Sequence, residues 1–190
     1  MTKRDIKILK FINRFGKVNT DQIAAYLEVS KVRTYQIMQR LKKSGMVELV
    51  RVFHNEPGIY LCTSEGAKFT NQEKLRELHI ASLKHDLKIL DVFLNIRDEM
   101  QIESFMTERE IRKSVDLEHF PDLLIKYSGE QISIEVELSR KSKTRMEAIR
   151  NFYLKTVFIK KVIYFVPKSL KTYIESIYHE YDFIEVRDLV

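Results

Sequence analysis

The N-terminal fold is decided by the stretch Thr20-Asp-Gln-Ile-Ala-Ala-Tyr-Leu-Glu-Val-Ser30-Lys-Val-Arg-Thr-Tyr-Gln-Ile-Met-Gln-Arg-Leu-Lys-Lys43. Thr20 is a good N-cap for a short helix. Ser30 follows a tight turn and is the N-cap of a second helix over residues 31–44, which Gly45 ends. The helical spacing of its apolar side chains predicts that this second helix buries one face, formed by Val32, Tyr35, Ile37, Met38 and Leu41. Two short helices joined by a tight turn are typical of a helix-turn-helix unit.

The segments on either side of this stretch complete a small domain. Apolar residues recur at helical spacing over residues 4–15, and Gly16 stops that helix. A strand over 46–53, a turn at 54–58 and a return strand over 59–63 are predicted after the second motif helix. Three helices and a β-hairpin in this order predict a winged helix-turn-helix domain, which we assign to residues 1–70.

The positive charge of the chain is concentrated in this domain. The 190 residues carry 33 Lys and Arg against 27 Asp and Glu, a net charge of +6. Residues 1–75 hold 14 of the cations and 7 of the anions, a net +7, whereas residues 76–190 hold 19 and 20, a net −1. Such an excess is expected of a domain that binds a polyanion such as double-stranded DNA, although a solvated basic surface gives the same numbers.

In a helix-turn-helix, the second helix enters the major groove with its N-terminal residues at the base edges. Arg33 and Gln36 have side chains that pair with guanine and adenine edges, and Lys31 and Thr34 lie on or near the same face. Phosphate contacts are predicted at Lys31, Arg40, Lys42 and Lys43, and minor-groove contacts from the hairpin at Arg51 and His54. The alternative interpretations are a solvated polar face and a module that docks another protein.

Several features bear on the cellular compartment. Cys62 is the only cysteine, so no internal disulfide can form and a reducing environment is expected. No apolar run approaches the roughly 20 residues that a membrane-spanning helix needs. The first residues lead directly into an amphipathic pattern and lack the apolar core of a signal peptide. These features predict a cytoplasmic protein with no membrane partner.

A second domain, of mixed α/β type, is predicted over residues 71–190. It opens with a long helix over 72–99, which follows a capping-box pattern from Thr70 to Glu73. The other elements are predicted as a strand at 102–106, a short helix after Thr107-Glu-Arg-Glu110, strands at 122–127 and 131–138, a helix at 142–157, a strand at 161–166, a helix at 169–179 and a strand at 183–187. A leucine seam on the long helix favours either a homodimer or packing against the sheet of the same chain, and consists of Leu83, Leu87, Leu90 and Leu94.

Three carboxylates are predicted on one face of the hairpin formed by strands 122–127 and 131–138. A two-residue turn at Ser128-Gly129 places Asp122 opposite Glu135, and a turn at Gly129-Glu130 places it opposite Glu137. Because side chains alternate between the faces of a strand, both registers put the three acids on one face, whereas a three-residue turn would not. The other face is the predicted core side, with Leu123, Ile125, Ile132, Ile134 and Val136.

Carboxylates on one face repel each other unless a positive group compensates them. Mg²⁺ prefers such oxygen ligands and can activate water for phosphodiester cleavage, so Asp122, Glu135 and Glu137 are a candidate metal site. In the alternative interpretation the acids line an exposed strand face and are neutralised by nearby cations, namely Lys126, Arg140, Lys141 or Lys143. Spacing alone leaves both interpretations open.

The motifs of the two domains resemble those of a known family. Pro121-Asp122, a short hairpin and Glu135-Val-Glu137 resemble the PD-(D/E)xK motif of restriction-endonuclease-like domains, and the element order fits the αβββαβ core of that fold. The whole chain resembles the replication-relaxation family of plasmids, integrative elements and phages, which joins a winged helix to a nuclease-like domain. The resemblance is carried by Ile59-Tyr-Leu-Cys-Thr-Ser-Glu-Gly66, Leu83-Lys-His-Asp-Leu-Lys-Ile-Leu-Asp-Val92, Thr107-Glu108, Pro121-Asp122 and Ile134-Glu-Val-Glu-Leu-Ser-Arg-Lys-Ser142.

The resemblance implies a function but includes one departure. Glu137 stands where the nuclease motif has Lys, and Lys141, at the start of the following helix, could replace it. The departure favours a DNA-binding accessory protein, not an enzyme, that assembles with replication or relaxosome proteins of a mobile element. Two alternatives stay open: a transcriptional regulator whose second domain senses a ligand or dimerises, and a Mg²⁺-dependent endonuclease that uses Asp122, Glu135, Glu137 and Glu108 with help from Lys141.

Overall fold

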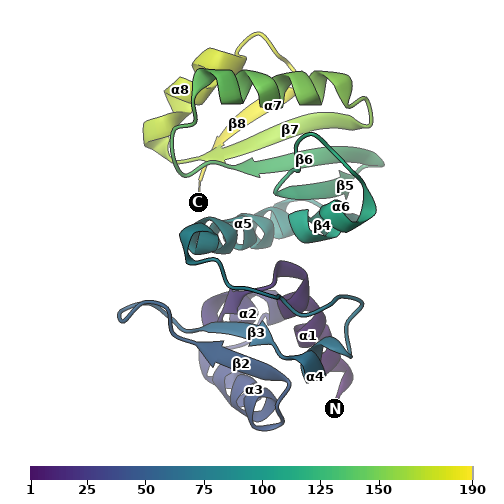
Figure 1. The fold of residues 1–190 in the computed structure, drawn as a ribbon, viewed down its shortest axis with the longest axis vertical. Helices are drawn as coiled ribbons and strands as arrows, with labels where there is room; N and C mark the ends of the chain where they lie inside the picture. Colours follow the sequence, from purple (N-terminus) through teal and green to yellow (C-terminus); the bar gives the residue numbers. More distant parts are fainter. Residues whose placement is uncertain (190) are drawn as a thin grey trace. The chain divides into compact units, whose positions relative to one another are not determined.

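The computed structural model of the chain describes residues 1–189. Within these residues the protein is of the α+β class, with eight helices and two β-sheets (Figure 1). Its contacts divide it into two compact units, Met1–Leu94 and Asn95–Val190. The three-stranded sheet belongs to the first unit and the five-stranded sheet to the second. Over this part of the chain, no helix combines the length and apolar character that crossing a membrane requires.

The first unit contains the predicted three helices and hairpin. Its elements are α1 (Lys3–Phe15), β1 (Val18–Asn19), α2 (Thr20–Leu27), α3 (Lys31–Lys43), β2 (Val47–Val50), β3 (Ile59–Cys62), α4 (Ser64–Ala67) and the first part of α5 (Ile80–Glu99). The sheet has the order β1-β3-β2, and both pairs are antiparallel. Helix α1 contacts β3 and α3 contacts β2, so the helices and the sheet enclose one core.

Local sequence sets the ends of these helices. Thr2 and Asp5 form a capping box at the start of α1, in which the Thr2 backbone N–H donates to Asp5 Oδ2 (2.8 Å). Gly16, with a φ of 81°, ends α1 as predicted. Asn19, not the predicted Thr20, is the N-cap of α2. The same Asn19 lies in β1, a two-residue strand that is too short to give an alternating pattern and was not predicted.

The helix predicted over 72–99 begins later, at Ile80. Thr70 does not start a helix, because its Oγ1 accepts a hydrogen bond from Asn13 Nδ2 of α1 (2.7 Å). The N-terminal part of α5 belongs to the first unit, where Gln22 Nε2 of α2 donates to Asp91 Oδ1 (2.8 Å). The two units therefore divide between residues 94 and 95, whereas the sequence placed the boundary between 70 and 71.

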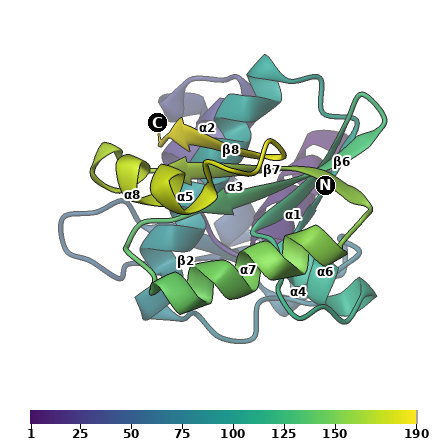
Figure 2. The same cartoon turned by 90° about the horizontal axis from the view of Figure 1, so that it is seen from above.

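The second unit is built on a five-stranded mixed sheet. Its elements are β4 (Ser104–Thr107), α6 (Glu108–Ser114), β5 (Leu123–Tyr127), β6 (Glu130–Val136), α7 (Lys143–Lys155), β7 (Ile159–Val166), α8 (Lys168–Tyr178) and β8 (Ile184–Asp188). The order is β4-β5-β6-β7-β8, antiparallel from β4 to β6 and parallel from β6 to β8. Helices α7 and α8 lie on one face of this sheet (Figures 1 and 2).

The β5–β6 hairpin has the first of the two predicted registers. Ser128 and Gly129 both have positive φ, 50° and 79°, which is the backbone of the two-residue turns that hairpins favour. Tyr127 consequently pairs with Glu130, and Leu123 pairs with Ile134. One step beyond Leu123, Asp122 reaches the level of Glu135.

Both faces of the sheet are buried around β6. The face under α7 and α8 carries a core that includes Met146, Ile149, Tyr153, Tyr164 and Tyr178. The opposite face is buried as predicted, through Leu123, Ile125, Ile132, Ile134 and Val136. The interpretation in which the acids line an exposed strand face is therefore wrong as regards exposure, because two helices cover the side of β6 from which Ser133 and Glu135 project.

Candidate functional site

Helix α3 presents a basic surface to solvent. Its buried residues are Thr34, Ile37, Met38 and Leu41, which follow the i, i+3, i+4, i+7 spacing of one helix face. The other side of the helix is exposed and includes predicted DNA contacts, namely Lys31, Arg33, Gln36, Lys42 and Lys43. The helix contains no Asp or Glu. Its exposed side therefore combines cations with amide groups.

Three assignments on α3 differ from the prediction. Val32 and Tyr35 are 69% and 44% exposed, although both were expected in the core. Thr34 was expected at the bases and is instead fully buried, with its Oγ1 donating to the backbone carbonyl of Ser30 (3.1 Å). A threonine whose hydroxyl donates to the carbonyl four residues earlier can be buried like an apolar residue. The polar character of threonine in the sequence does not reveal this. Thr34 is thus removed from the base-reading set.

Two predicted phosphate contacts have partners inside the unit. Arg40 donates to both carboxylate oxygens of the buried Asp5 (2.5 and 3.0 Å), which ties α3 to α1. These hydrogen bonds hold the pKa of Asp5 well below its usual range. Lys31 Nζ lies 2.6 Å from Asp21 Oδ1, and this hydrogen bond raises the pKa of Lys31. Arg40 therefore has a structural role, and Lys31 is shared with α2.

The remaining candidates of the first unit are free to reach a ligand. Arg33 Nη1 donates to Gln36 Oε1 (3.0 Å), which places the two predicted base-reading side chains side by side. Arg51 and His54 are exposed in the segment between β2 and β3. Among residues 1–189, no carboxylate pairs with Arg33, Lys42, Lys43 or Arg51.

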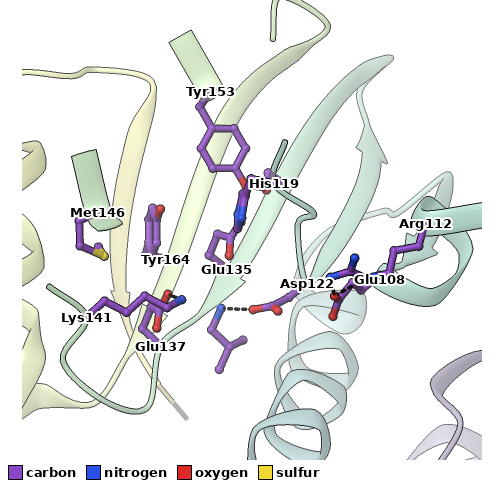
Figure 3. A network of polar contacts seen from close by, with 12 residues as sticks. Glu108, Arg112, His119, Asp122, Glu135, Glu137, Lys141, Met146, Tyr153 and Tyr164 are labelled. Atoms are coloured by element: carbon purple, nitrogen blue, oxygen red, sulfur yellow. Dashed lines mark hydrogen bonds and ion pairs between the residues drawn. The ribbon is translucent and has the colours of Figure 1, made fainter. Parts of the chain in front are cut away.

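The three predicted acids of the second unit, Asp122, Glu135 and Glu137, lie near the C-terminal end of β6, each with its own partner (Figure 3). Asp122 Oδ2 accepts a hydrogen bond from the backbone N–H of Val136 (2.7 Å). Glu135 Oε1 accepts from the hydroxyl of Tyr153, and His119 Nε2 lies 2.7 Å from the same oxygen. Protein groups thus compensate the first two of the three predicted acids.

Glu137 is compensated by a cation, as one of the two sequence interpretations predicted. It forms an ion pair with Lys141, four residues later. Glu135 and Glu137 are only 2% and 3% exposed, so their partners matter more than those of surface acids. Burial and the neighbouring Glu135 raise the pKa of Tyr153 well above its usual range, so its hydroxyl stays protonated and acts as a donor.

No group of three His, Cys, Asp or Glu side chains within residues 1–189 is arranged to hold a metal ion. Asp122, Glu135 and Glu137 lie near one another, but each carboxylate bonds to a different donor: a backbone N–H, a tyrosine hydroxyl and a lysine. Glu108 is brought next to Asp122 by a backbone hydrogen bond (3.2 Å), while its side chain pairs with Arg112 (2.6 Å). Mg²⁺ binding therefore stays a prediction, because the carboxylates of Asp122, Glu135 and Glu137 each bond to a protein donor in this structure.

Two residues, His119 and Tyr153, contact Glu135 and were not predicted from the sequence. His119 comes from the irregular segment between α6 and β5, where no periodicity assigns a direction to a side chain. Tyr153 lies on the buried stripe of α7, and no role was predicted for it from the sequence. Its hydroxyl was the available signal, because a buried tyrosine hydroxyl normally needs a hydrogen-bond partner.

The second unit also contains an apolar pocket of about 200 Å³. Its walls include Ile111, Val115, Leu117 and Phe158. Gln131 also lines it, and the Oε1 atom of this residue is buried without a hydrogen-bond partner among the described residues.

Comparisons with known proteins give little further information. No protein-family model matches the chain, and no curated protein matches it. One similar solved structure is a chain described as "PigF with SAH", at 12% identity and a TM-score of 0.22. The alignment covers 99% of this chain and 62% of the other, so this chain spans less than two thirds of that protein's length. At this TM-score the likeness supports no conclusion about fold or function.

Proposed function

We propose that the protein binds double-stranded DNA sequence-specifically, through a winged helix-turn-helix in which α3 is the recognition helix. The observation that carries the proposal is the exposed face of α3. Arg33 and Gln36 lie at its N-terminal end, where a recognition helix meets base edges, and Lys42 and Lys43 lie at its C-terminal end. In this interpretation β2 and β3 form the wing, and Arg51 and His54 lie in its tip.

The charge of the two units supports this assignment. Counted over the observed units, residues 1–94 hold 17 cations and 10 anions, a net +7, and residues 95–190 hold 16 and 17, a net −1. The excess therefore stays with the first unit when the observed boundary replaces the predicted one. A positive unit attracts DNA phosphates regardless of sequence, and α3 then supplies the discrimination.

The test is a binding series on a site selected from a random duplex library. We expect the double variant Arg33→Ala/Gln36→Ala to lose most of the preference for that site, since each two-pronged base contact contributes about 1–3 kcal/mol. Thr34→Val is the matched control, because this residue lies on the same turn but is buried. Its preference for the site should equal that of the wild type.

The same series separates phosphate contacts from base contacts. Lys42→Ala/Lys43→Ala should lower the slope of log affinity against log salt by about 2, at roughly 0.9 per contact, and leave base preference unchanged. A wild-type chain that binds no duplex even at low salt would refute the proposal. Equal loss of preference in Thr34→Val and in the Arg33/Gln36 variant would refute the role of α3.

For the second unit we propose a restriction-endonuclease-like fold that does not cleave DNA. The arrangement of β4, β5, β6, α7 and β7 after a long helix agrees with the αβββαβ order that the resemblance implies. Glu137 stands in place of the motif Lys, and the Lys141 that could replace that Lys is paired with Glu137. This supports an accessory role in replication or relaxation of plasmid or phage DNA, in contact with other proteins of that process.

The alternative function is a metal-dependent endonuclease, favoured by the proximity of Asp122, Glu135 and Glu108. Incubation of supercoiled plasmid with the protein and Mg²⁺ or Mn²⁺ distinguishes the two. We expect no cleavage under either metal. Cleavage that Asp122→Ala abolishes would establish the endonuclease and reject the accessory role.

A transcriptional regulator is the second alternative, and the apolar pocket of the second unit favours it because such a pocket could hold an effector. Footprinting on the DNA of the host element separates this role from the proposed one: protection only at promoters, never at an origin, would favour the regulator. A homodimer stays a prediction. Leu83, Leu90 and Leu94 of the seam are buried, so they do not form an exposed stripe. Sedimentation with and without DNA tests the dimer.

A further inference from the structure

A strongly basic segment interrupts the near-neutral second unit. Residues 139–145 have the sequence Ser-Arg-Lys-Ser-Lys-Thr-Arg, with four cations and no acid. The segment connects the end of β6 to the first turn of α7, and we call it the basic loop. The net charge of the unit, −1, conceals this local excess.

Three cations of the basic loop have no carboxylate partner. Lys141 is neutralised by Glu137, but Arg140, Lys143 and Arg145 are exposed and form no ion pair with any residue between 1 and 189. Many other cations of this unit are paired, for example Lys126 with Glu103, Lys161 with Glu185 and Lys171 with Asp188. The basic loop therefore carries an uncompensated charge of three.

Contacts with α8 and a helix cap fix the loop in place. The guanidinium of Arg140 lies over the ring of Tyr173, 4.0 Å from its centroid. The Tyr173 hydroxyl donates to the backbone carbonyl of Lys141 (2.9 Å). Ser142 caps α7 by accepting from the backbone N–H of Arg145 (3.2 Å). A loop that is already ordered loses less conformational entropy when it binds a ligand.

We propose that Arg140, Lys143 and Arg145 contact phosphates of the same duplex DNA that α3 binds. This inference rests on the proposed function of the first unit. A guanidinium matches a phosphate with two parallel hydrogen bonds, and a lysine adds a point charge. Unpaired cations that displace counterions from DNA gain affinity from that release. DNA is favoured over an acidic protein, because a duplex held by α3 supplies phosphates to this chain at high effective concentration.

The experiment compares two triple variants of the full chain. Arg140→Ala/Lys143→Ala/Arg145→Ala removes the unpaired charge of the basic loop. Lys113→Ala/Lys155→Ala/Lys160→Ala removes the same charge from exposed positions elsewhere in the unit. Affinity for the selected duplex is measured by fluorescence anisotropy over a salt series, and circular dichroism melting checks that each variant folds.

We expect the basic-loop variant to lower the salt slope by up to about 3, at roughly 0.9 per contact, and to bind at least about tenfold more weakly at physiological salt. Base preference should not change, and the control variant should stay near the wild type. The charge-preserving variant Arg140→Lys/Lys143→Arg/Arg145→Lys should keep most of the slope, which separates loss of charge from damage to the loop.

Several outcomes would overturn the inference. Equal slopes for the basic-loop variant and its control, with normal binding by the wild type and weakened binding by the Arg33/Gln36 variant, would reject the basic loop and leave the proposed function standing. Loss of slope in the charge-preserving variant as large as in the alanine variant would also reject it. Failure of the wild type to bind any duplex would reject the proposed function itself.

Discussion

The hydroxyl of Tyr153 should contribute measurably to the stability of the second unit. It donates to Glu135, which is 2% exposed, and lies 2.7 Å from Ser133 Oγ. Replacing Tyr153 with Phe keeps the ring and its packing against Phe152 and His119. The substitution therefore removes one donor from a buried carboxylate, and it also removes the acceptor of the buried Ser133 hydroxyl.

The expected loss in free energy of unfolding depends on the hydrogen-bond partners that Glu135 retains. A hydrogen bond to a charged group contributes about 1.5–3 kcal/mol, and water cannot replace the donor at this depth. His119 remains as the second partner, so the carboxylate is not left bare. We therefore expect Tyr153→Phe to destabilise the second unit by about 2–3 kcal/mol.

Hydrogen exchange of backbone amides is the appropriate assay, because the chain has two compact units and a single unfolding transition would not report which of them is destabilised. The chain has no Trp, so fluorescence offers no local probe of this core. Amides of β6 and α7 should exchange faster in Tyr153→Phe, by the factor that corresponds to the lost stability. Amides of α1 and α3 should be unaffected.

Tyr181→Phe is the matched control. Its hydroxyl forms no hydrogen bond within residues 1–189, although its ring contacts Phe183 and Arg150. We expect a change within about 0.5 kcal/mol, as for other surface substitutions. If Tyr153→Phe were equally neutral, Glu135 would not depend on this donor, and the account of how the buried acids are compensated would be refuted.

The remaining predictions concern the first unit and the β5–β6 turn. The pKa of Asp5 is lowered by its hydrogen bonds with Arg40, so its contribution is present above the ordinary carboxylate pKa of 3.8 and is lost as pH falls below it. Urea unfolding should show the wild type about 2 kcal/mol more stable than Asp5→Asn at pH 7, with the difference shrinking towards pH 2; a constant difference would contradict the assignment. A methyl group on Gly66 would lie 2.0 Å from the Met46 carbonyl oxygen, so Gly66→Ala should cost about 3 kcal/mol or more. Gly129→Ala meets no atom within 4 Å and should cost only about 1–2 kcal/mol from its φ of +79°; equal thermal shifts for the two would exclude the predicted clash.

Elements with strong local signals were predictable from the sequence. Ser30 caps α3 as predicted, and the Ser128-Gly129 turn fixes the hairpin register through its positive φ angles. The strands and helices of the second unit from residue 123 onwards fall within two residues of their predicted bounds. Thr70 was predicted to begin a helix and does not. A threonine that can cap a helix can equally form a hydrogen bond with a distant side chain, here Asn13.

The candidate sites were less predictable, because they depend on which way polar side chains turn. Thr34 reads as polar and is buried, whereas Val32 reads as apolar and is 69% exposed. Arg40 was a plausible phosphate contact until tertiary structure placed the buried Asp5 beside it. Arg40 and Asp5 are 35 residues apart in the sequence, so neither periodicity nor charge counting could reveal their pairing.

The pairing of Glu137 with Lys141 links the buried acids of the second unit to the basic loop. Glu137 forms an ion pair with Lys141, so Lys141 carries no uncompensated charge. The cations of the basic loop that are available to phosphates are therefore the exposed Arg140, Lys143 and Arg145. Cleavage would need a cation beside the carboxylates, whereas Glu135 accepts a hydrogen bond from the Tyr153 hydroxyl and lies 2.7 Å from His119 Nε2. The buried acids are compensated by protein groups, and the unpaired cations of the basic loop are exposed to solvent. Both features favour our proposal that the second unit binds nucleic acid and does not cleave it.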